Sequence, residues 1–357
     1  MSDSSKIIFV TGASGYLASH VVYQLAEQGH RVRASVRKNK MLPVRDLYLK
    51  SHPNVEIVQI DDLAQGDLGD VFKGVDVVIH TASPLPGRGS AEVILKGAIE
   101  GSLNVLQQAE KAGVRKFVVT SSTLAVTGDP SIKDGAYRAE HWSPWTKEDA
   151  ERMPYVVSKK FAELAVWDWA EAHPHVDVTV INPPFLYGPL APIHLPVAPG
   201  DYISLSTALM VYNLISPDGT YPPEPAYTDV RDTAAAHVRA ALSALPKETS
   251  TDIKSPRKRV VFASPHGVVF KDVLDMIRNA RPELAGRIIS KGSVPEFEID
   301  RYHVDFGRIE EIVGLKKEDF HTLEETLLDT IDDMLALEKE WVAQGYVLPP
   351  NVPPMML

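Results

Sequence analysis

The sequence predicts an α/β protein in which a doubly wound parallel sheet is joined to a smaller C-terminal lobe. Through roughly the first 180 residues, short β-branched apolar runs alternate with helical segments, a pattern typical of a sheet covered by helices on both faces. The first apolar run ends in a glycine-containing turn that leads into a helix. After residue 182 the alternation stops, and prolines and tyrosines become frequent.

The predicted strands are short, rich in Val and Ile, and bounded by turn residues, as expected for strands buried on both faces. Strands are predicted at residues 6–10, 32–36, 55–60, 75–80, 116–120, 176–181 and 259–263. Helices are predicted at residues 16–28, 68–72, 91–111, 154–172, 230–242, 270–278, 308–313 and 323–344. This order of elements indicates a sheet wound in two directions.

The composition is that of a globular protein and disfavours several classes of function. The chain has 357 residues and a net charge of −10, which argues against nucleic acid or an anionic membrane as the main partner. It has no cysteine, and its twelve histidines form no H-E-x-x-H motif, so we expect no metal site. Because we see no secretory signal and no apolar stretch of about 18 residues, we expect a cytoplasmic protein.

The turn after the first strand is predicted to bind the pyrophosphate of a dinucleotide. Its sequence, TGASGYLA at residues 11–18, has the form T-G-x-x-G-x-x-A. Small residues allow a tight turn and a close approach of the anion, and the following helix directs unpaired N–H groups toward it. The predicted contacts are Thr11, Gly12, Ser14, Gly15, Tyr16 and Leu17. The alternative is an ordinary structural turn.

The end of the second strand favours NADP(H) over NAD(H). An acidic residue here would bind the ribose hydroxyls of NAD, but no carboxylate follows until Asp46. Arg37 can instead meet a 2′-phosphate with two parallel hydrogen bonds, and Lys40 can add positive charge. A solvated basic loop is the alternative interpretation.

Four more predicted cofactor contacts follow later strands. Asp62 and Leu63 come after the third strand, where a carboxylate and an aliphatic side chain could contact adenine. The neighbouring Asp61 could instead cap a helix or remain a surface charge. Ala82 and Ser83 close the fourth strand at the carboxyl edge of the sheet, where the cofactor must lie.

These features define a predicted division into domains. Residues 1–182 plus 231–263 are expected to form an NADP-binding domain of the Rossmann type. Residues 183–230 plus 264–345 are expected to form the substrate-binding lobe, and the Pro-rich tail at 346–357 a loose extension.

Tyr155 and Lys159 are the candidate catalytic pair. They lie four residues apart, hence on one face of the helix that begins near Pro154. A free phenol titrates near pH 10, and a nearby ammonium together with an oxidised nicotinamide would lower its pKa. Ser122, after the fifth strand, could donate a hydrogen bond to the same substrate oxygen. The alternative is an amphipathic helix in which Lys159 is solvated.

Several sequence segments resemble the extended short-chain dehydrogenases/reductases over almost the whole chain. They are EGSLNVL at 100–106, KFVVTSS at 116–122, INPPFLYGP at 181–189 and TDVRD at 228–232. Within that superfamily, the chain is most similar to fungal NADPH-dependent aldehyde and ketone reductases of the methylglyoxal-reductase type, which are related to dihydroflavonol and cinnamoyl-CoA reductases.

The resemblance implies particular roles for individual residues. The Ser-Tyr-Lys triad of the group falls on Ser122, Tyr155 and Lys159, and the choice of Ser122 over Ser121 rests on this resemblance alone. The implied cofactor contacts are Gly12, Gly15, Tyr16, Arg37, Asp62, Leu63, Ala82, Pro183 and Ser206. Two positions depart from the pattern: Ala18 replaces the usual third glycine, and Ala98 replaces an Asn that supports a water beside the lysine, which leaves the proton-relay path open.

The predicted function is reduction of aldehydes or ketones to alcohols with NADPH. An apolar substrate pocket is predicted from Leu85, Thr123, Phe185 and Tyr202, and ordinary packing is the alternative for each. The rival functions are an epimerase or dehydratase of the extended family, which would recycle bound NAD, and a non-catalytic nucleotide sensor. The sequence leaves the physiological substrate, the stereochemistry, and the choice between monomer and homodimer open.

Overall fold

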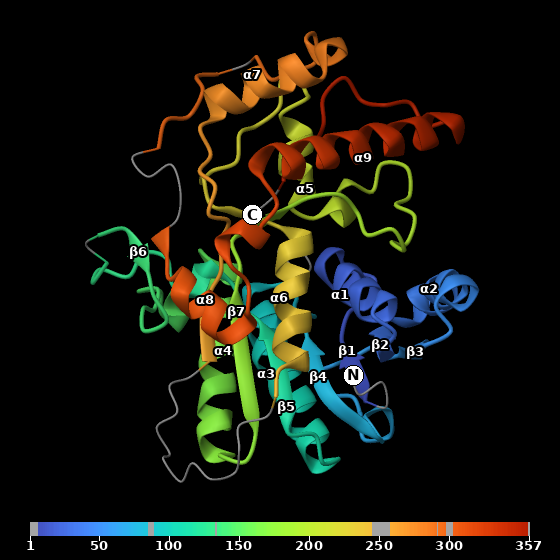
Figure 1. The fold of residues 1–357 in the computed structure, drawn as a ribbon, viewed down its shortest axis with the longest axis vertical. Coiled ribbons are helices and arrows are strands. Elements are labelled where there is room, and N and C mark those ends of the chain that lie inside the picture. The colour runs from blue at the N-terminus through green and yellow to red at the C-terminus, as the bar shows by residue number, and fades with distance from the viewer. Residues whose placement is uncertain are drawn as a thin grey trace.

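A seven-stranded, fully parallel sheet organises the lower half of the molecule (Figure 1). The computed structural model describes residues 6–84, 89–132, 134–244, 258–290, 292–297 and 303–355. In spatial order the strands are β10 (Lys258–Val261), β7 (Asp177–Asn182), β5 (Lys116–Thr120), β4 (Val75–His80), β1 (Ile7–Val10), β2 (Arg31–Val36) and β3 (Val55–Gln59). The chain therefore winds outward from β1 in both directions, as predicted.

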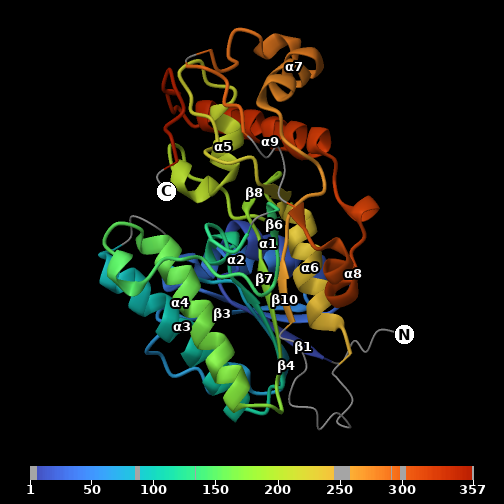
Figure 2. The same ribbon diagram turned by 90° about the vertical axis from the view of Figure 1, so that its left-hand side faces the viewer.

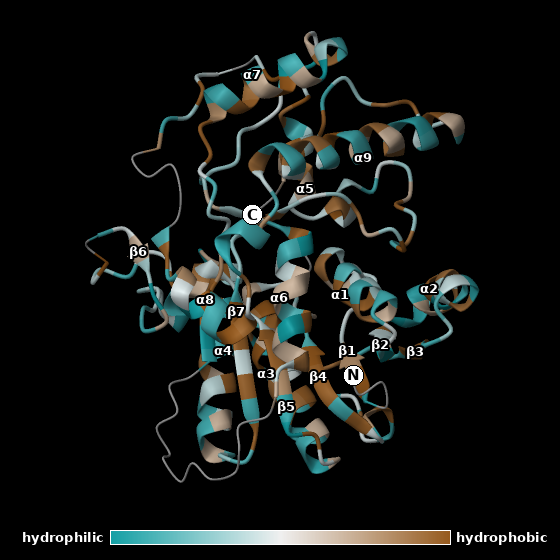
Figure 3. Cartoon of the chain, viewed as in Figure 1, coloured by the Kyte–Doolittle hydropathy of each residue, from teal (hydrophilic) through white to brown (hydrophobic). Residues whose placement is uncertain are grey.

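Helices cover both faces of the sheet, as Figure 2 shows. On one face α3 (Ala91–Lys111) and α4 (Pro154–Ala172) pack against each other. On the other face α1 (Tyr16–Glu27) packs against α6 (Val230–Leu242), and α2 (Lys38–Ser51) contacts β3. Figure 3 shows apolar residues concentrated in the central strands, which are buried between these layers.

The helix starts follow from local residues. Ser90 caps α3 by accepting a hydrogen bond from the Val93 amide, and Asp229 caps α6 through the Arg231 amide. Pro154 is the first residue of α4, where its missing N–H carries no cost. These starts fix the register of the helices that border the carboxyl edge of the sheet.

The second lobe lies at the top of Figure 1 and has its own core. It contains α5 (Ala208–Asn213), α7 (Phe270–Ala280) and α9 (Leu323–Ala343). Leu205, Ile277, Ile331 and Trp341 are buried together in this core. Two small sheets, β6 (Ala136–Tyr137) with β11 (His303–Val304) and β8 (Phe185–Tyr187) with β9 (Tyr227–Asp229), complete the strands. The remaining elements are the short helices η1 (Asp70–Phe72), η2 (Thr123–Ala125), η3 (Lys147–Asp149), η4 (Tyr202–Leu205), η5 (Pro282–Leu284) and η6 (Lys317–Asp319).

Two parts of the predicted domain division differ from the structure. Helix α8 (Phe306–Val313), assigned above to the second lobe, packs against α6 and β10. Its Ile309 and Val313 join the core of the sheet domain. The apolar face of α8 is evident in the sequence, but periodicity alone does not identify the surface that covers such a face.

The C-terminal tail is also not a loose extension, at least as far as residue 355. Val352 is buried, and its amide donates to Ser216 Oγ at 2.9 Å. Asn213 Nδ2 donates to the carbonyl of Pro353 at 3.0 Å. Proline prevents a helix here, but it does not prevent an extended segment from packing on a lobe.

Helix α2 was not predicted from the sequence. The segment contains Pro43 inside the helix and a cluster of basic residues at the helix start, and both disfavour a helix. Asp61 Oδ1 accepts a hydrogen bond from the Lys38 amide at 2.7 Å, so this carboxylate satisfies an N-terminal amide of α2. Within the described ranges, no helix is long and apolar enough to cross a bilayer.

Candidate active site

The loops that carry the predicted site residues share one edge of the sheet. β1 pairs with β2 on one side and with β4 on the other, so the strand order reverses between β1 and β4. In open α/β sheets, ligands bind at the carboxyl ends of the strands next to such a reversal. Most of the predicted residues follow β1, β2, β3, β4, β5 or β7 and so lie at this edge, whereas Tyr155 and Lys159 are on α4 and Ser206 follows η4.

The glycine-rich turn forms a cradle that a larger residue would fill. Gly12 has a φ of +73°, and a Cβ placed on it would lie 3.1 Å from the Cβ of Ala82. Gly15 is exposed and precedes α1, and no side chain caps that helix. The first amides of α1 are therefore left for another acceptor, and this arrangement fits the pyrophosphate of a dinucleotide.

Thr11 holds this turn against β4. Its hydroxyl accepts hydrogen bonds from the amides of Thr81 and Ala82 at 3.0 and 3.1 Å, and it lies 3.0 Å from His80 Nδ1. Thr11 is fully buried, so the structure gives it a scaffolding role, and its contact with the cofactor stays a prediction. On the opposite side the carbonyl of Ser35 accepts from the Ala13 amide at 2.9 Å. Ser35 was not identified from the sequence.

The other predicted residues of the turn differ in their exposure. Ser14 is half-buried at the turn, whereas Leu17 is buried in the core of the sheet domain. Tyr16 is also buried, and its hydroxyl donates to the carbonyl of Gly188 at 2.6 Å. This bond ties the start of α1 to the chain that leads into the second lobe.

The predicted 2′-phosphate residues lie at the start of α2. Arg37 is exposed and precedes the helix, and Lys40 is half-buried in its first turn. Hydrogen bonds from the Lys38 amide and Gln59, with smaller contributions from the charges of Lys38 and Arg37, lower the pKa of Asp61. Asp61 therefore carries its charge at neutral pH as a partner of α2.

The loop after β3 is fixed by α3. Asp62 is exposed, and its Oδ1 accepts from the amides of Ala64 and Gln65 at 2.8 and 3.1 Å. Leu63 is half-buried, and its carbonyl accepts from Asn104 Nδ2 at 2.9 Å. These hydrogen bonds fix the positions of Asp62 and Leu63 at the sheet edge, and their contact with adenine stays a prediction.

Tyr155 and Lys159 lie on one face of α4, and the Lys159 ammonium is 5.6 Å from the centre of the Tyr155 ring. Burial lowers the pKa of Lys159 to about 8, although the charge of Glu163 opposes this shift. Burial raises the pKa of Tyr155 to about 12. The expected lowering of the Tyr155 pKa is therefore not found in the protein alone; the phenol stays protonated at neutral pH, the state an acid needs.

The hydrogen bonds at the end of β5 distinguish the two serines. Ser121 Oγ donates to the buried carboxylate of Glu163 at 2.7 Å, so its proton is engaged. Ser122 Oγ instead accepts from the amide of Leu124 at 3.2 Å, which leaves its own proton for a further acceptor. Ser122 is the residue that precedes η2, and η2 packs against α4. Of the two serines, Ser121 has its hydroxyl proton engaged by a carboxylate, and the catalytic role of Ser122 stays a prediction.

The predicted substrate residues are not all brought together. Thr123 is buried directly after Ser122, and Phe185 is half-buried on β8. Tyr202 lies in the core of the second lobe, with its ring 5.3 Å from that of Trp341, which corresponds to the packing interpretation. Leu85 lies outside the described residues.

Four further predicted cofactor contacts lie after β4, β7 and η4. Pro183 is buried after β7, and its carbonyl accepts from the amide of Thr123 at 3.0 Å. Ser206 follows η4 and has a φ of +53°. Among the non-glycine residues that the structure describes, it alone has a positive φ. Ala82 and Ser83 are half-buried after β4. A left-handed backbone at a serine costs about 1–3 kcal/mol and is found most often at functional sites.

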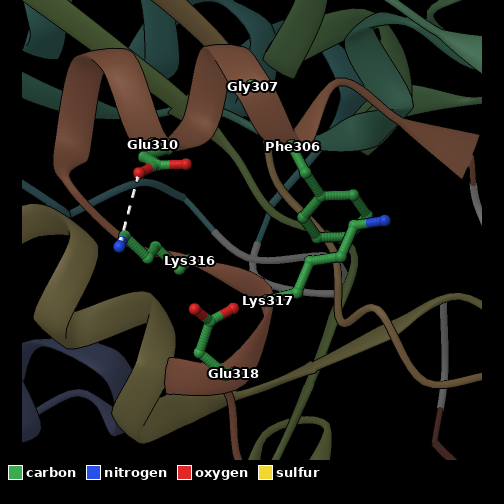
Figure 4. Close-up of a pocket in the computed structure, with 6 residues that line it drawn as sticks. All are labelled: Phe306, Gly307, Glu310, Lys316, Lys317 and Glu318. Carbon is green, nitrogen blue, oxygen red and sulfur yellow. Dashed lines mark ion pairs between the residues drawn. The ribbon is translucent and has the colours of Figure 1, made fainter.

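A pocket of about 350 Å³ lies elsewhere, between α8 and η6 (Figure 4). Its lining is mostly charged: Lys316 pairs with Glu310 at 3.9 Å, and the Lys317 ammonium lies 4.8 Å from the centre of the Phe306 ring. None of the predicted cofactor or catalytic residues lines it. In the described part of the chain, no group of three or more His, Asp and Glu residues is arranged to hold a metal ion.

Comparison with known proteins identifies the family. The model of the NAD dependent epimerase/dehydratase family matches residues 8–250. The chain belongs to this family. A putative NADPH-dependent methylglyoxal reductase from Candida albicans is 31% identical over 94% of this chain and 98% of its own length. A cinnamoyl-CoA reductase from Medicago truncatula is 32% identical over 67% of this chain and 73% of its own length.

Solved structures confirm the fold of this epimerase/dehydratase family member. The yeast methylglyoxal/isovaleraldehyde reductase complexed with NADPH superposes with a TM-score of 0.75 at 26% identity, covering 93% of this chain and 99% of that one. The resemblance noted in the sequence is thereby confirmed, as is the Rossmann-type α/β fold. The individual site residues stay predictions.

Proposed function

We propose that the protein is an NADPH-dependent carbonyl reductase that converts aldehydes or ketones to alcohols. The observation that carries this proposal is the placement of Tyr155 and Lys159 on α4, next to the end of β5 that carries Ser122. The glycine-rich cradle lies at the same edge of the sheet. Similarity to NADPH-dependent reductases supports both the cofactor and the reaction.

Each residue has a separate task in this reaction. Bound NADPH supplies the hydride that reaches the carbonyl carbon. Ser122 donates a hydrogen bond to the carbonyl oxygen and stabilises the negative charge that develops there. Tyr155, protonated at neutral pH, gives its proton to the same oxygen. Lys159 supplies a positive charge beside the phenol, which lowers the cost of leaving a phenolate behind.

The rival is an epimerase or dehydratase that keeps its cofactor and recycles it. The residues at the end of β2 argue against it, because Arg37 stands where an NAD-recycling enzyme would use a carboxylate. The test is NADPH oxidation by the purified protein with short aldehydes, diketones and aryl ketones. We expect one NADPH to be consumed for each alcohol formed. Conversion of a substrate without net NADPH oxidation would favour the rival.

Replacing Arg37 with serine is expected to weaken the binding of NADPH but not that of NADH. A bidentate bond between a guanidinium and a phosphate contributes about 1.5–3 kcal/mol, so KM for NADPH should rise about 10- to 100-fold. KM for NADH should stay the same, because NADH lacks the 2′-phosphate. Steady-state kinetics with both cofactors check this. An equal rise in both values would contradict a phosphate contact.

Reduction should also depend on pH through Lys159. Its pKa is about 8, so the ammonium is present below this pH and is lost as the pH rises through it. We therefore expect kcat/KM, which reports groups of the free enzyme, to fall above about pH 8. Profiles from pH 6 to 10 check this. A value of kcat/KM that stays constant to pH 10 would contradict a role for the charged lysine.

We further propose that the lobe built on α5, α7 and α9 covers the substrate and that Phe185 and Thr123 border it. Phe185 lies on β8, directly after the predicted cofactor contact Pro183. The expected partner is a small carbonyl compound, and we expect no binding to nucleic acid or to membranes. The expected compartment is the cytoplasm. The net charge of −10 and the absence of cysteine support this setting.

A further inference from the structure

A third residue of α4 shares the face that carries the proposed catalytic pair. Glu163 follows Tyr155 and Lys159 at intervals of four residues, and only 2% of its surface is exposed. A carboxylate is costly to bury unless it is fully paired. Four side chains from four parts of the chain satisfy this one.

The partners of Glu163 join three strands of the sheet to α4. Ser121 Oγ, after β5, donates to Oε2 at 2.7 Å, and Asn182 Nδ2, at the end of β7, donates to the same oxygen at 2.7 Å. Arg259 Nε, on β10, donates to Oε1 at 2.6 Å. Trp167 Nε1, one turn further along α4, donates to Oε1 at 3.1 Å. The carboxylate therefore fixes the helix to the sheet at the edge where the site lies.

Arg259 is held as firmly as the carboxylate it pairs with. Only 1% of its surface is exposed, which is rare for an arginine. Its Nη1 donates to the carbonyls of Ala139 and His141, and its guanidinium stacks 3.7 Å from the centre of the Trp142 ring. Every part of this cation is engaged, so Glu163 has a partner that cannot move away.

The same network reaches the backbone of Ser122. Asn182 Nδ2 donates both to the Glu163 carboxylate and to the carbonyl of Ser122, the latter at 3.1 Å. A buried ion pair contributes little net stability compared with apolar packing of similar volume. The position of the Glu163–Arg259 pair is therefore more informative than its energy. Here the location connects Ser122 on one side with Lys159, one helical turn away, on the other.

We propose that Glu163, fixed by Arg259 and linked through Asn182, is a positioning residue that holds Ser122 and Lys159 in their reactive arrangement. This inference rests on the proposed reductase function. Glu163 touches neither cofactor nor substrate in this account. It acts through the two residues that do, by geometry toward Ser122 and by charge toward Lys159.

The charge can be tested separately from the geometry. Among the described residues, three titratable groups lie near Lys159: Tyr155 on its own helix, whose ring it faces, His80 at the end of β4, and Glu163. His80 is buried and its pKa is lowered to about 4, so it is neutral at pH 7. Glu163 is then the anion that favours the charged form of Lys159. Removing its charge should lower the pKa of Lys159 further.

The experiment compares three variants with the wild-type enzyme, all assayed for NADPH-dependent reduction. Glu163→Gln keeps the shape and removes the charge, and Asn182→Ala cuts the link to Ser122 but leaves the charge in place. Asp177→Asn is the matched control, because Asp177 forms a buried ion pair with Lys116 at 3.6 Å. That pair joins the same strands, β5 and β7, at the opposite edge of the sheet.

For Glu163→Gln we expect kcat to fall about 10- to 100-fold, the range produced by small misplacements of catalytic groups, with KM for the carbonyl compound unchanged. The alkaline limb of its pH profile should move to lower pH. Asn182→Ala should lower kcat without moving that limb. Asp177→Asn should lower the melting temperature but keep the kcat and pH profile of the wild type.

Two results would overturn the inference. One is a Glu163→Gln enzyme with the kcat and pH profile of the wild type. The other is a loss of kcat in Asp177→Asn as large as in Glu163→Gln, which would indicate general destabilisation. If Glu163→Gln does not fold, Asn182→Ala decides: an unchanged kcat rejects the positioning role. A wild-type protein that consumes no NADPH with any carbonyl compound would instead reject the proposed function, so the two failures are distinguishable.

Discussion

Replacing Tyr155 with phenylalanine is expected to lower kcat for carbonyl reduction by about 10²- to 10⁴-fold, the range that a positioned general acid contributes. The ring still packs on α4, but no proton is available for the carbonyl oxygen. The high pKa of this phenol, about 12, means that the residue is protonated throughout the working range. Its loss is therefore the loss of an acid at every pH from 6 to 9.

The variant must be compared for binding as well as turnover. We expect Kd for NADPH, measured by fluorescence titration, to be the same in Tyr155→Phe and in the wild type, because the phenol contributes to chemistry more than to binding. Steady-state assays give kcat. A variant that retains the wild-type kcat would show that another group donates the proton.

Replacing Gly12 with valine is expected to raise Kd for NADPH about 100-fold. A 100-fold change corresponds to about 2.8 kcal/mol of binding free energy, because each 1.4 kcal/mol is about a tenfold change in Kd. The added Cβ would lie 3.1 Å from the Cβ of Ala82, so the turn must open where the pyrophosphate is expected. Isothermal titration of NADPH into the variant measures the change.

Gly29 provides the matched control for this substitution. It follows α1 with a φ of +78°, close to that of Gly12, but no atom lies within 4 Å of a Cβ placed on it. Gly29→Val should therefore share the backbone strain and the loss of stability, while Kd for NADPH stays at the wild-type value. Equal losses of affinity in the two variants would mean that Gly12 matters for folding and not for the cradle.

The sequence predicted the sheet well because its signals are local. β4, β5, α3, α4 and α6 begin and end where the pattern of apolar and turn residues places them. Each is bounded by a residue whose chemistry is visible in the sequence, such as Ser90 before α3 or Pro154 at the start of α4. The prediction was weaker where tertiary contacts decide, as with α8 and the C-terminal tail, whose apolar residues do not reveal which surface they meet.

In the candidate site, too, local features could be predicted from the sequence and tertiary contacts could not. The spacing of Tyr155 and Lys159 and the glycine-rich turn could be read directly from the chain. Glu163 and Arg259 could not, because 96 residues separate them and only the fold brings β10 beside α4. One signal was available: Arg259 begins the apolar run that was predicted to be a buried strand, and a buried arginine requires an anion.

The most direct test of the account follows hydrogen from the cofactor to the product. NADPH carrying deuterium at the transferable position of the nicotinamide ring is incubated with the wild-type enzyme and an aldehyde, and the alcohol is analysed by mass spectrometry. We predict one deuterium on the carbinol carbon for each NADPH oxidised, and no labelled product from Tyr155→Phe within the same time. An alcohol that contains no deuterium, or a changed substrate with the labelled NADPH left intact, would contradict the account.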